Sequence, residues 1–213
     1  SIEIPNTVKT IGHSAFSNCI SLETVKLPEN LEIIDYNMFS NCTNLKNIEI
    51  PDTVLKIGAN AFSFTSLEKI KLPDSLKTID SYAFYQCENL KTIDIPDSVE
   101  SLGESAFASC KQLNSIKLSN SLKKKKKDTF SACINLEKVF IPKTVTEIGE
   151  SAFCYSYVYN DMYSMDIFYS GSEEEWKDII IRDYNKKLKI SVIHYNCPTI
   201  LSMHSIQINN ISN

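Results

Sequence analysis

The cysteines, histidines and carboxylates are the side chains of this 213-residue chain that could do chemistry. Seven cysteines are present, and five of them occupy one position of a repeating pattern: Cys19, Cys42, Cys87, Cys110 and Cys133. A nucleophilic thiol needs a base beside it, and a zinc site would need paired cysteines, but no C-x₂-C pair occurs. Thiols that recur with the apolar positions of a pattern instead behave as small apolar core groups. We therefore expect a ladder of buried, free and unreactive cysteines.

The remaining reactive side chains are scattered. His13, His194 and His204 fall in three separate segments, and Cys154 and Cys197 lie outside the ladder, where they could pair in a disulfide. The sequence has no G-x-S-x-G, H-E-x-x-H, phosphate-binding loop or dinucleotide fingerprint. We predict that the chain is not an enzyme, has no catalytic residues, and binds no cofactor or metal.

Composition excludes other classes. The net charge of −4 gives no reason to expect nucleic-acid binding. No apolar run approaches the roughly 18 residues that a membrane span needs. The first residues already have the pattern of a strand and show no signal peptide. We expect the natural protein to continue upstream of Ser1.

A repeat of about 23 residues must position all of these groups. One phenylalanine marks each unit: Phe16, Phe39, Phe62, Phe84, Phe107, Phe130 and Phe153. In the fifth unit, Ile93 and Ile95 alternate with Asp94, which indicates a short strand with one buried face. A proline then ends the strand, Gly103 marks a turn, and Ala106-Phe107 suits one tight helical turn. Such units stack as a solenoid, with the strands forming one parallel sheet.

The outward residue of each predicted strand is the candidate binding position. From the first unit on, these residues alternate in sign until the seventh: Glu3, Lys26, Glu49, Lys71, Asp94, Lys117 and Phe140. A second row alternates similarly: Glu23, Lys46, Glu68, Lys91, Asn114 and Glu137. One interpretation is a self-neutralising ladder that fixes register and solubility. The other is a mixed-charge binding face with Phe140 as an aromatic anchor.

The sixth unit and the C-terminal part depart from the pattern. Lys125 occupies an apolar slot within the run from Lys123 to Lys127, so we expect its side chain to reach outward or the coil to loosen. A tyrosine-rich loop follows the repeats and leaves glycan binding open: Tyr155, Tyr157, Tyr159 and Tyr163. Next we predict a strand over 166–169, a helix capped by Ser172 and Glu175 whose Trp176, Ile179 and Ile180 cover coil seven, and a strand over 189–195.

The strand, Pro, Ile-Gly, Ala-Phe, Cys and Leu spacing over residues 2–153 resembles the BspA-like class of leucine-rich repeats. Ser119 in the proline slot, Thr129 and Met38 depart from it. The segment from Ile167 to Trp176 resembles the element that often closes such arrays. The resemblance implies an α/β repeat solenoid: right-handed, with one parallel β-sheet on the concave face, short helical or 3-10 turns, and a small C-terminal cap. We expect seven repeats over 1–153, a capping element over 154–196, and a tail or linker over 197–213.

The resemblance also implies a non-catalytic, cell-surface or secreted protein-binding module, with adhesion to host or neighbouring-cell glycoproteins. Fibronectin-like or fibrinogen-like proteins are the expected partners, and we expect a monomer. The alternatives are a rigid spacer that displays other domains of a longer surface protein, or a glycan-binding module. The family fixes no binding residues, so the candidate concave face rests on its outward side chains: Lys26, Glu49, Lys71, Asp94, Lys117 and Phe140.

Overall fold

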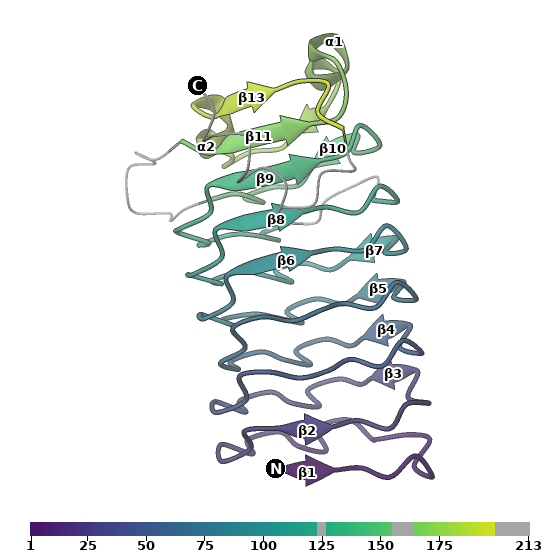
Figure 1. Ribbon diagram of the computed structural model, residues 1–213. Coiled ribbons are helices and arrows are strands. Elements are labelled where there is room, and N and C mark those ends of the chain that lie inside the picture. Colours follow the sequence, from purple (N-terminus) through teal and green to yellow (C-terminus); the bar gives the residue numbers. More distant parts are fainter. Residues whose placement is uncertain (123–126, 155–163, 199–213) are drawn as a thin grey trace, which may run out of the picture.

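The computed structural model describes residues 1–122, 127–154 and 164–198. In these ranges the chain winds as a stack of coils along one axis, from the N-terminus at one end to the C-terminal segment at the other (Figure 1). All strand pairs in the described part are parallel. Ile93 lies beside Ile116, and Ile116 lies beside Val139, so neighbouring strands are one repeat apart. The predicted repeat is therefore one turn of a parallel β-solenoid.

Strands on the first side of the stack contain the predicted apolar alternation. They are β1 (Ile2–Glu3), β2 (Val25–Lys26), β6 (Thr92–Asp94), β8 (Ser115–Lys117), β9 (Lys138–Ile141), β11 (Asp166–Tyr169) and β13 (Val192–His194). β1 pairs with β2, and the others form one sheet in the order β13-β11-β9-β8-β6. Residues 45–50 and 68–73 contain no strand, so the prediction of one continuous sheet was wrong. The interruption adjoins the third unit, which is one residue short.

A second line of strands, which we did not predict, runs along another side of the stack. It consists of β3 (Ile33–Ile34), β4 (Lys56–Ile57), β5 (Thr78–Ile79), β7 (Ser101–Leu102), β10 (Glu147–Ile148) and β12 (Ile180–Ile181). β3, β4, β5 and β7 form one sheet in chain order, and β10 pairs with β12. Each strand is only two residues long. That length is too short for an alternating pattern to be visible in a sequence.

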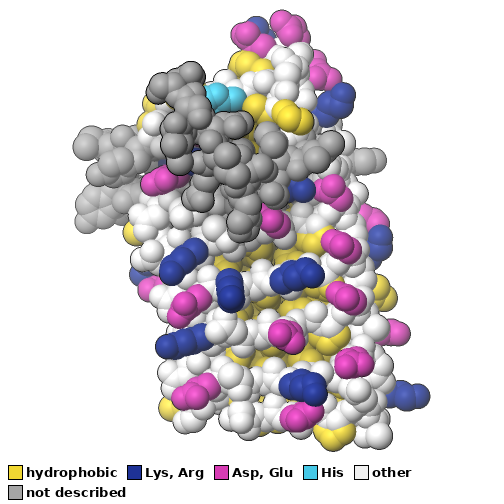
Figure 2. Space-filling model, viewed as in Figure 1, with side chains coloured by type: hydrophobic (Ala, Val, Ile, Leu, Met, Phe, Trp, Pro, Cys, Tyr) yellow, Lys and Arg dark blue, Asp and Glu magenta, His cyan; other side chains and the backbone are white. Residues whose placement is uncertain are grey.

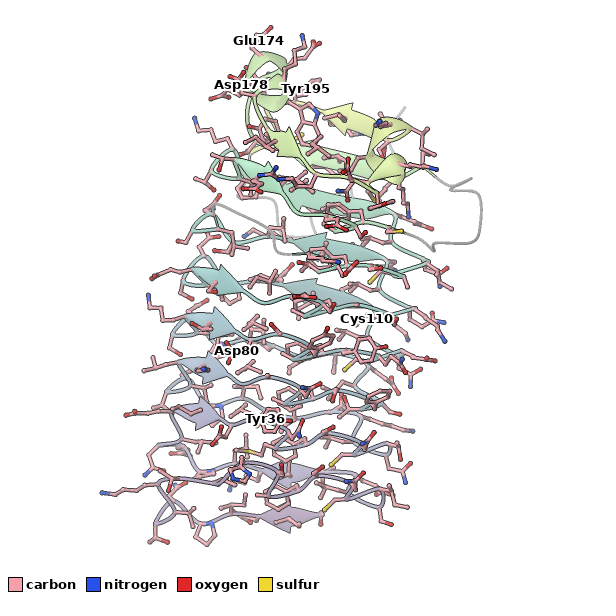
Figure 3. The ribbon with its side chains drawn as sticks, turned by 180° about the vertical axis from the view of Figure 1, so that it is seen from behind. Tyr36, Asp80, Cys110, Glu174, Asp178 and Tyr195 are labelled. Atoms are coloured by element: carbon pink, nitrogen blue, oxygen red, sulfur yellow. The ribbon has the colours of Figure 1, made fainter. Side chains whose placement is uncertain are left out.

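The turns between the two sides are not helical, which corrects the prediction of helical or 3-10 turns. Coil after coil, they contain two residues with a left-handed φ, such as Asn37 (54°) and Asn41 (60°), and these interrupt any helix. No described glycine has a positive φ. Gly103 is required by close approach instead, because a Cβ there would lie 2.2 Å from the backbone nitrogen of Ser81. Tyr36 and Asp80 lie, like Gly103, just after strands of the second line (Figure 3).

The core is a single continuous stack. The seven repeat phenylalanines stack face to face, with ring centroids 5.0 to 5.7 Å apart and interplanar angles of 2° to 19°. Phe16, at the first coil, is only partly buried, whereas Phe39 to Phe130 are almost fully buried. Each coil thus buries its apolar side chains against the next coil, as predicted for a solenoid.

The cysteine ladder is confirmed as a set of free thiols, and four of its members are buried. The Sγ atoms of Cys42, Cys87, Cys110 and Cys133 each donate to the carbonyl oxygen of the phenylalanine in the preceding coil, at 3.0 to 3.2 Å. Cys19 is half-buried, and Cys154 and Cys197 do not form the disulfide that remained open. Thr65 occupies the cysteine slot of the short unit and donates to the carbonyl of Phe62 at 2.8 Å.

The C-terminal segment continues both sides of the stack. β11 pairs with β9, so the predicted strand over 166–169 is confirmed. The strand predicted over 189–195 is confirmed only at Val192–His194, where β13 pairs with β11, because Lys189 belongs to a short helix. Helix α1 (Glu173–Lys177) begins with the predicted capping box between Ser172 and Glu175. Figure 3 shows Glu174 and Asp178 at this end of the molecule. Trp176 is buried and its ring meets that of Tyr169 edge-on, with centroids 5.1 Å apart.

Two features of this segment differ from the predictions. Ile180 does not cover coil seven but lies in β12 and is 52% exposed, while Ile179 is buried as expected. A second short helix, α2 (Lys186–Lys189), follows. Asn185 before it fixes the segment to coil seven, because its side chain donates to the carbonyl of Gly149 and accepts from the backbone nitrogen of Phe153. No helix among the described residues is long and apolar enough to cross a membrane.

Candidate functional site

The first side of the stack carries the predicted site residues in one line. We call the surface over β1, β2, residues 47–50 and 69–72, β6, β8, β9, β11 and β13 the sheet face. Its central row consists of Glu3, Lys26, Glu49, Lys71, Asp94, Lys117 and Phe140. The strand register places Glu3 beside Lys26, Asp94 beside Lys117, and Lys117 beside Phe140. Glu3 to Asp94 are exposed, and Lys117 and Phe140 are half-buried.

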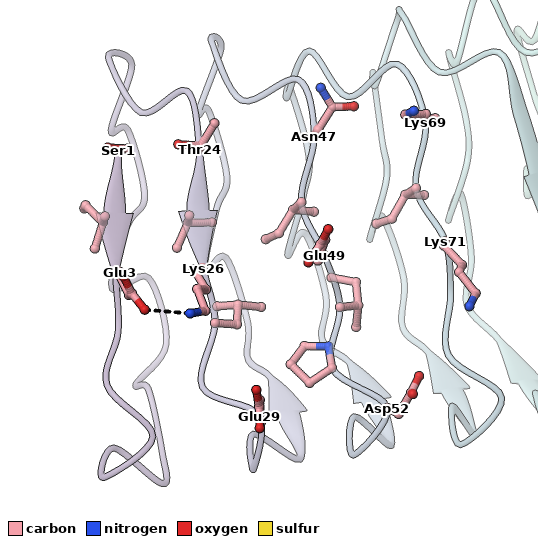
Figure 4. Close-up of a pocket in the computed structure, with 17 residues that line it drawn as sticks. Ser1, Glu3, Thr24, Lys26, Glu29, Asn47, Glu49, Asp52, Lys69 and Lys71 are labelled. Atoms are coloured by element: carbon pink, nitrogen blue, oxygen red, sulfur yellow. Dashed lines mark hydrogen bonds and ion pairs between the residues drawn. The ribbon is translucent and has the colours of Figure 1, made fainter.

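Within the described structure, only one pair of neighbouring side chains in the central row forms an ion pair. The Nζ atom of Lys26 lies 2.7 Å from Oε1 of Glu3 (Figure 4). That hydrogen bond raises the pKa of Lys26. Among the described residues, no ion pair joins Glu49, Lys71, Asp94 or Lys117 to a neighbour. Alternation of sign in the sequence therefore does not produce a paired ladder along this row.

Ion pairs between coils lie mainly away from the central row. Lys56 pairs with Asp80 at 2.8 Å, and Lys111 pairs with Glu88 at 2.7 Å. Lys77 also lies 3.5 Å from Glu100. The second alternating row, from Glu23 to Glu137, shows no side-chain ion pair among its members in the described part of the chain. Opposite charges of neighbouring coils thus pair with each other on other sides of the stack.

The central row continues beyond Phe140 as an aromatic stack that we did not predict. The rings of Phe140 and Phe168 are stacked with centroids 4.7 Å apart, and those of Phe168 and His194 with centroids 4.8 Å apart. His194 Nε2 also lies 3.0 Å from Oδ1 of Asp166. The signal was present in the sequence, because residues 166–169 repeat the alternation of residues 138–141. Aligning these two strands would have placed Phe168 in the row.

Two depressions hollow the sheet face, and the predicted residues line both. The first has a volume of about 1080 Å³ and includes Lys26, Glu49 and Lys71 in its lining (Figure 4). The second has a volume of about 790 Å³ and includes Asp94, Lys117 and Phe140. The two share Lys71, so they form one line along the face. Figure 2 shows apolar side chains between charges of both signs on this surface.

An acidic rim borders the same depressions. It consists of the acidic residue that follows the proline in coils two to five, namely Glu29, Asp52, Asp74 and Asp97. All of them are exposed. Glu29 and Asp52 line the first depression, and Asp74 and Asp97 line the second. A bound partner would meet a row of mixed charge flanked on one edge by negative charge.

The described residues do not assemble a reactive centre. No group of three or more histidine, cysteine, aspartate or glutamate side chains among them is arranged to bind a metal ion. Burial raises the pKa of Cys87 and of Cys133 to about 12, which suppresses the nucleophilic thiolate. His13 lies in the first coil and His194 in β13, where its ring stacks on Phe168.

Several predictions concern residues outside the described ranges. Lys125, with most of the lysine run, belongs to 123–126, and His204 belongs to 199–213. The tyrosine-rich loop belongs to 155–163. Lys127 is described, and its Nζ lies 3.6 Å from Oε1 of Glu150. Ser119 is buried in the proline slot, where its hydroxyl donates to the carbonyl of Val99 at 2.7 Å.

Comparison with known proteins identifies the repeat. The family model described as BspA type leucine rich repeat region, in six copies, matches residues 1–64 and 32–160. A leucine-rich repeat protein from Bacteroides ovatus has a similar structure, with a TM-score of 0.69 and 28% identity over 92% of this chain and 55% of that one. This chain thus spans about half of that protein. A comparison with curated proteins found no match.

Two further structures are similar. The T. pallidum leucine rich repeat protein has a TM-score of 0.64 and 30% identity, over 75% of this chain and 72% of that one. A leucine rich cell surface protein from Faecalibacterium prausnitzii has a TM-score of 0.51 and 21% identity, over 84% of this chain and 81% of that one. At that identity the Faecalibacterium protein supports the fold alone.

Proposed function

We propose, from the premise that the chain belongs to the BspA-type leucine-rich repeat family, that it is a non-catalytic protein-binding module whose sheet face contacts the partner. The observation that carries the proposal is the central row. It presents four charged side chains that form no ion pair with any described residue, along two depressions, and it ends in a stack of three aromatic rings of which Phe140 lines the second depression. Repeat arrays of this kind use such extended surfaces for binding.

The composition of the face suits a protein partner. Interfaces concentrate their binding energy in aromatic anchors surrounded by polar groups, and Phe140 and Phe168 provide such an anchor at one end of the row. The charged residues along the rest of the row would set orientation and association rate more than affinity. Strands hold Lys26, Asp94, Lys117 and Phe140 in fixed positions relative to one another, which lowers the entropic cost of binding.

We further propose that the module is displayed on a cell surface or secreted, with extracellular glycoproteins of the fibronectin or fibrinogen kind as its partners. Support comes from the family, whose resemblance implies display on a cell surface or secretion. The C-terminal segment would then close the array, with Trp176 and Asn185 holding it on coil seven.

The test is binding to immobilised fibronectin and fibrinogen by the chain and by a variant with Lys71→Ser, Asp94→Ser and Phe140→Ser. A matched control changes Lys77→Ser, Glu100→Ser and Tyr36→Ser, which line neither depression. We expect saturable binding that the first variant loses and the control keeps. Equal binding by all three proteins would remove the sheet face from the proposal, and loss in both variants would indicate a fold effect detectable by circular dichroism.

A spacer is the second candidate, and the ion pairs between coils favour it. Pairs such as Lys56 with Asp80 and Lys111 with Glu88 stiffen the stack without any ligand. A spacer would bind none of the panel proteins at micromolar concentration. The glycan alternative rests on tyrosines outside the described residues, and no observation favours it.

A further inference from the structure

We propose that the sheet face pairs with the sheet face of a second copy of this chain. The two stacks run antiparallel, and the two-fold axis that relates them lies between the two faces, parallel to the strands, at the level between coils three and four. The inference rests on the proposed function, because it assumes that the sheet face is an interaction surface. It names one partner of that face from the order of the charges in the central row.

The order of charges makes the row complementary to itself when one copy is reversed. Coil one of one copy then faces coil six of the other, coil two faces coil five, and coil three faces coil four. The facing side chains are Glu3 with Lys117, Lys26 with Asp94, and Glu49 with Lys71. Each contact occurs twice across the axis, as in any isologous dimer. All of these contacts bring opposite charges together.

The neighbouring positions on the face tolerate the same arrangement. Two residues before the central row, the side chains of coils one to six are Ser1, Thr24, Asn47, Lys69, Thr92 and Ser115. Reversal sets Thr24 against Thr92 and Asn47 against Lys69. No two like charges meet in this row. A two-fold axis along the stack would instead set each charge of the central row against its own copy, which is repulsive.

The structure leaves these charges available. Glu49, Lys71, Asp94 and Lys117 take part in no ion pair within the described chain. The single lateral pair, Lys26 with Glu3, has both side chains 69% exposed, so a facing carboxylate or ammonium group can reach it. Charges that alternate in sign along the central row, and that do not pair with their neighbours in the row, remain able to pair with charges on a facing chain.

The acidic rim opposes the pairing and limits its strength. Under the same axis Asp52 faces Asp74, and Glu29 faces Asp97. Six coils about 4.8 Å apart, with about four residues across, give roughly 300–400 Å² per partner, which is the size of weak, transient interfaces. We therefore infer a dimer that forms at high local concentration and is monomeric in dilute solution, where a monomer was expected from the sequence.

The test is sedimentation equilibrium of the full chain from low micromolar to near-millimolar concentration, at low and high salt. We expect a monomer–dimer equilibrium that salt weakens. Glu49→Lys and Lys71→Glu should each weaken it by about tenfold or more, because each creates two like-charge contacts. The double variant restores opposite charges at both contacts, so its dimerisation should return to the original level. Asp52→Asn with Asp74→Asn should tighten the dimer.

Lys77→Glu, outside both depressions, serves as the control and should leave the equilibrium unchanged. A monomer throughout the concentration range, or a double variant no better than the single ones, would overturn the inference. Binding to fibronectin or fibrinogen is measured separately with dilute, monomeric chain. Failure of self-association with retained glycoprotein binding would therefore contradict the dimer and leave the proposed function standing.

Discussion

At the scale of single residues, the cysteine ladder has a structural role. Each buried thiol donates to a phenylalanine carbonyl of the preceding coil, as Cys110 does to Phe84 at 3.2 Å (Figure 3). These carbonyl groups already accept a backbone N–H of their own coil, as Phe84 does from Cys87, and the thiol is a second donor small enough to fit between two coils. Thr65 in the short unit differs, because its hydroxyl donates to the carbonyl of Phe62 in its own coil and lies 3.2 Å from the Sγ atom of Cys87 in the next coil. The slot therefore selects for a compact donor and not for reactivity.

The ladder predicts a pH dependence of stability. Burial raises the pKa of Cys87 and of Cys133 from 9.0 to about 12, whereas the unfolded chain ionises near 9. The unfolded state then binds fewer protons, so the free energy of unfolding falls as pH rises from 9 toward 12. Ionisation of each thiol in the unfolded chain should lower the free energy of unfolding by about 1 kcal/mol at one pH unit above the unfolded pKa.

Urea unfolding at pH values on either side of the unfolded pKa measures this effect. Cys87→Ala with Cys133→Ala should have a flatter pH dependence than the original chain, whatever its stability at neutral pH. Ser63→Ala, which removes a buried hydroxyl that does not ionise in this pH range, is the matched control and should keep the original slope. An identical slope in the double variant would show that these thiols do not ionise on unfolding.

At the scale of elements, the turns show what could and could not be predicted. The first-side strands, the capping box and the phenylalanine stack followed from the spacing of large apolar residues and from Ser172 and Glu175. The second-side strands and the left-handed turn residues did not, because they involve two-residue strands and several residue types, including Phe64 at φ 59° and Tyr82 at φ 61°. The glycine slot was identified, but its cause is contact between coils, which no single unit reveals.

This contact predicts opposite effects at two glycines in the same slot. Gly103→Ala should lower the free energy of unfolding by about 1–3 kcal/mol, because its Cβ would lie 2.2 Å from the nitrogen of Ser81 and backbone must move. Gly12→Ala should raise it by about 0.4–1 kcal/mol, because nothing lies within 4 Å and the unfolded chain loses freedom. Thermal unfolding of both variants measures the difference, and equal effects would contradict the role of close approach.

At the scale of the whole molecule, the stack separates support from recognition. The continuous core and the ion pairs on other sides hold the coils together, while four charges of the central row remain unpaired in the described structure. The six candidate residues were predictable because the repeat fixes which strand position points outward. Phe168 and His194 were missed because the chain leaves the 23-residue period before β11, so their place in the row depends on strand pairing.

Lysine footprinting tests the central claim, that the sheet face is the interaction surface, most directly. The chain would be acetylated briefly, alone and bound to immobilised fibrinogen or fibronectin, and each lysine quantified by mass spectrometry. The account predicts protection of Lys26, Lys71 and Lys117, which line the depressions, and unchanged labelling of Lys77 and Lys111, which do not. Protection of Lys77 and Lys111 with free labelling of the central row would contradict it.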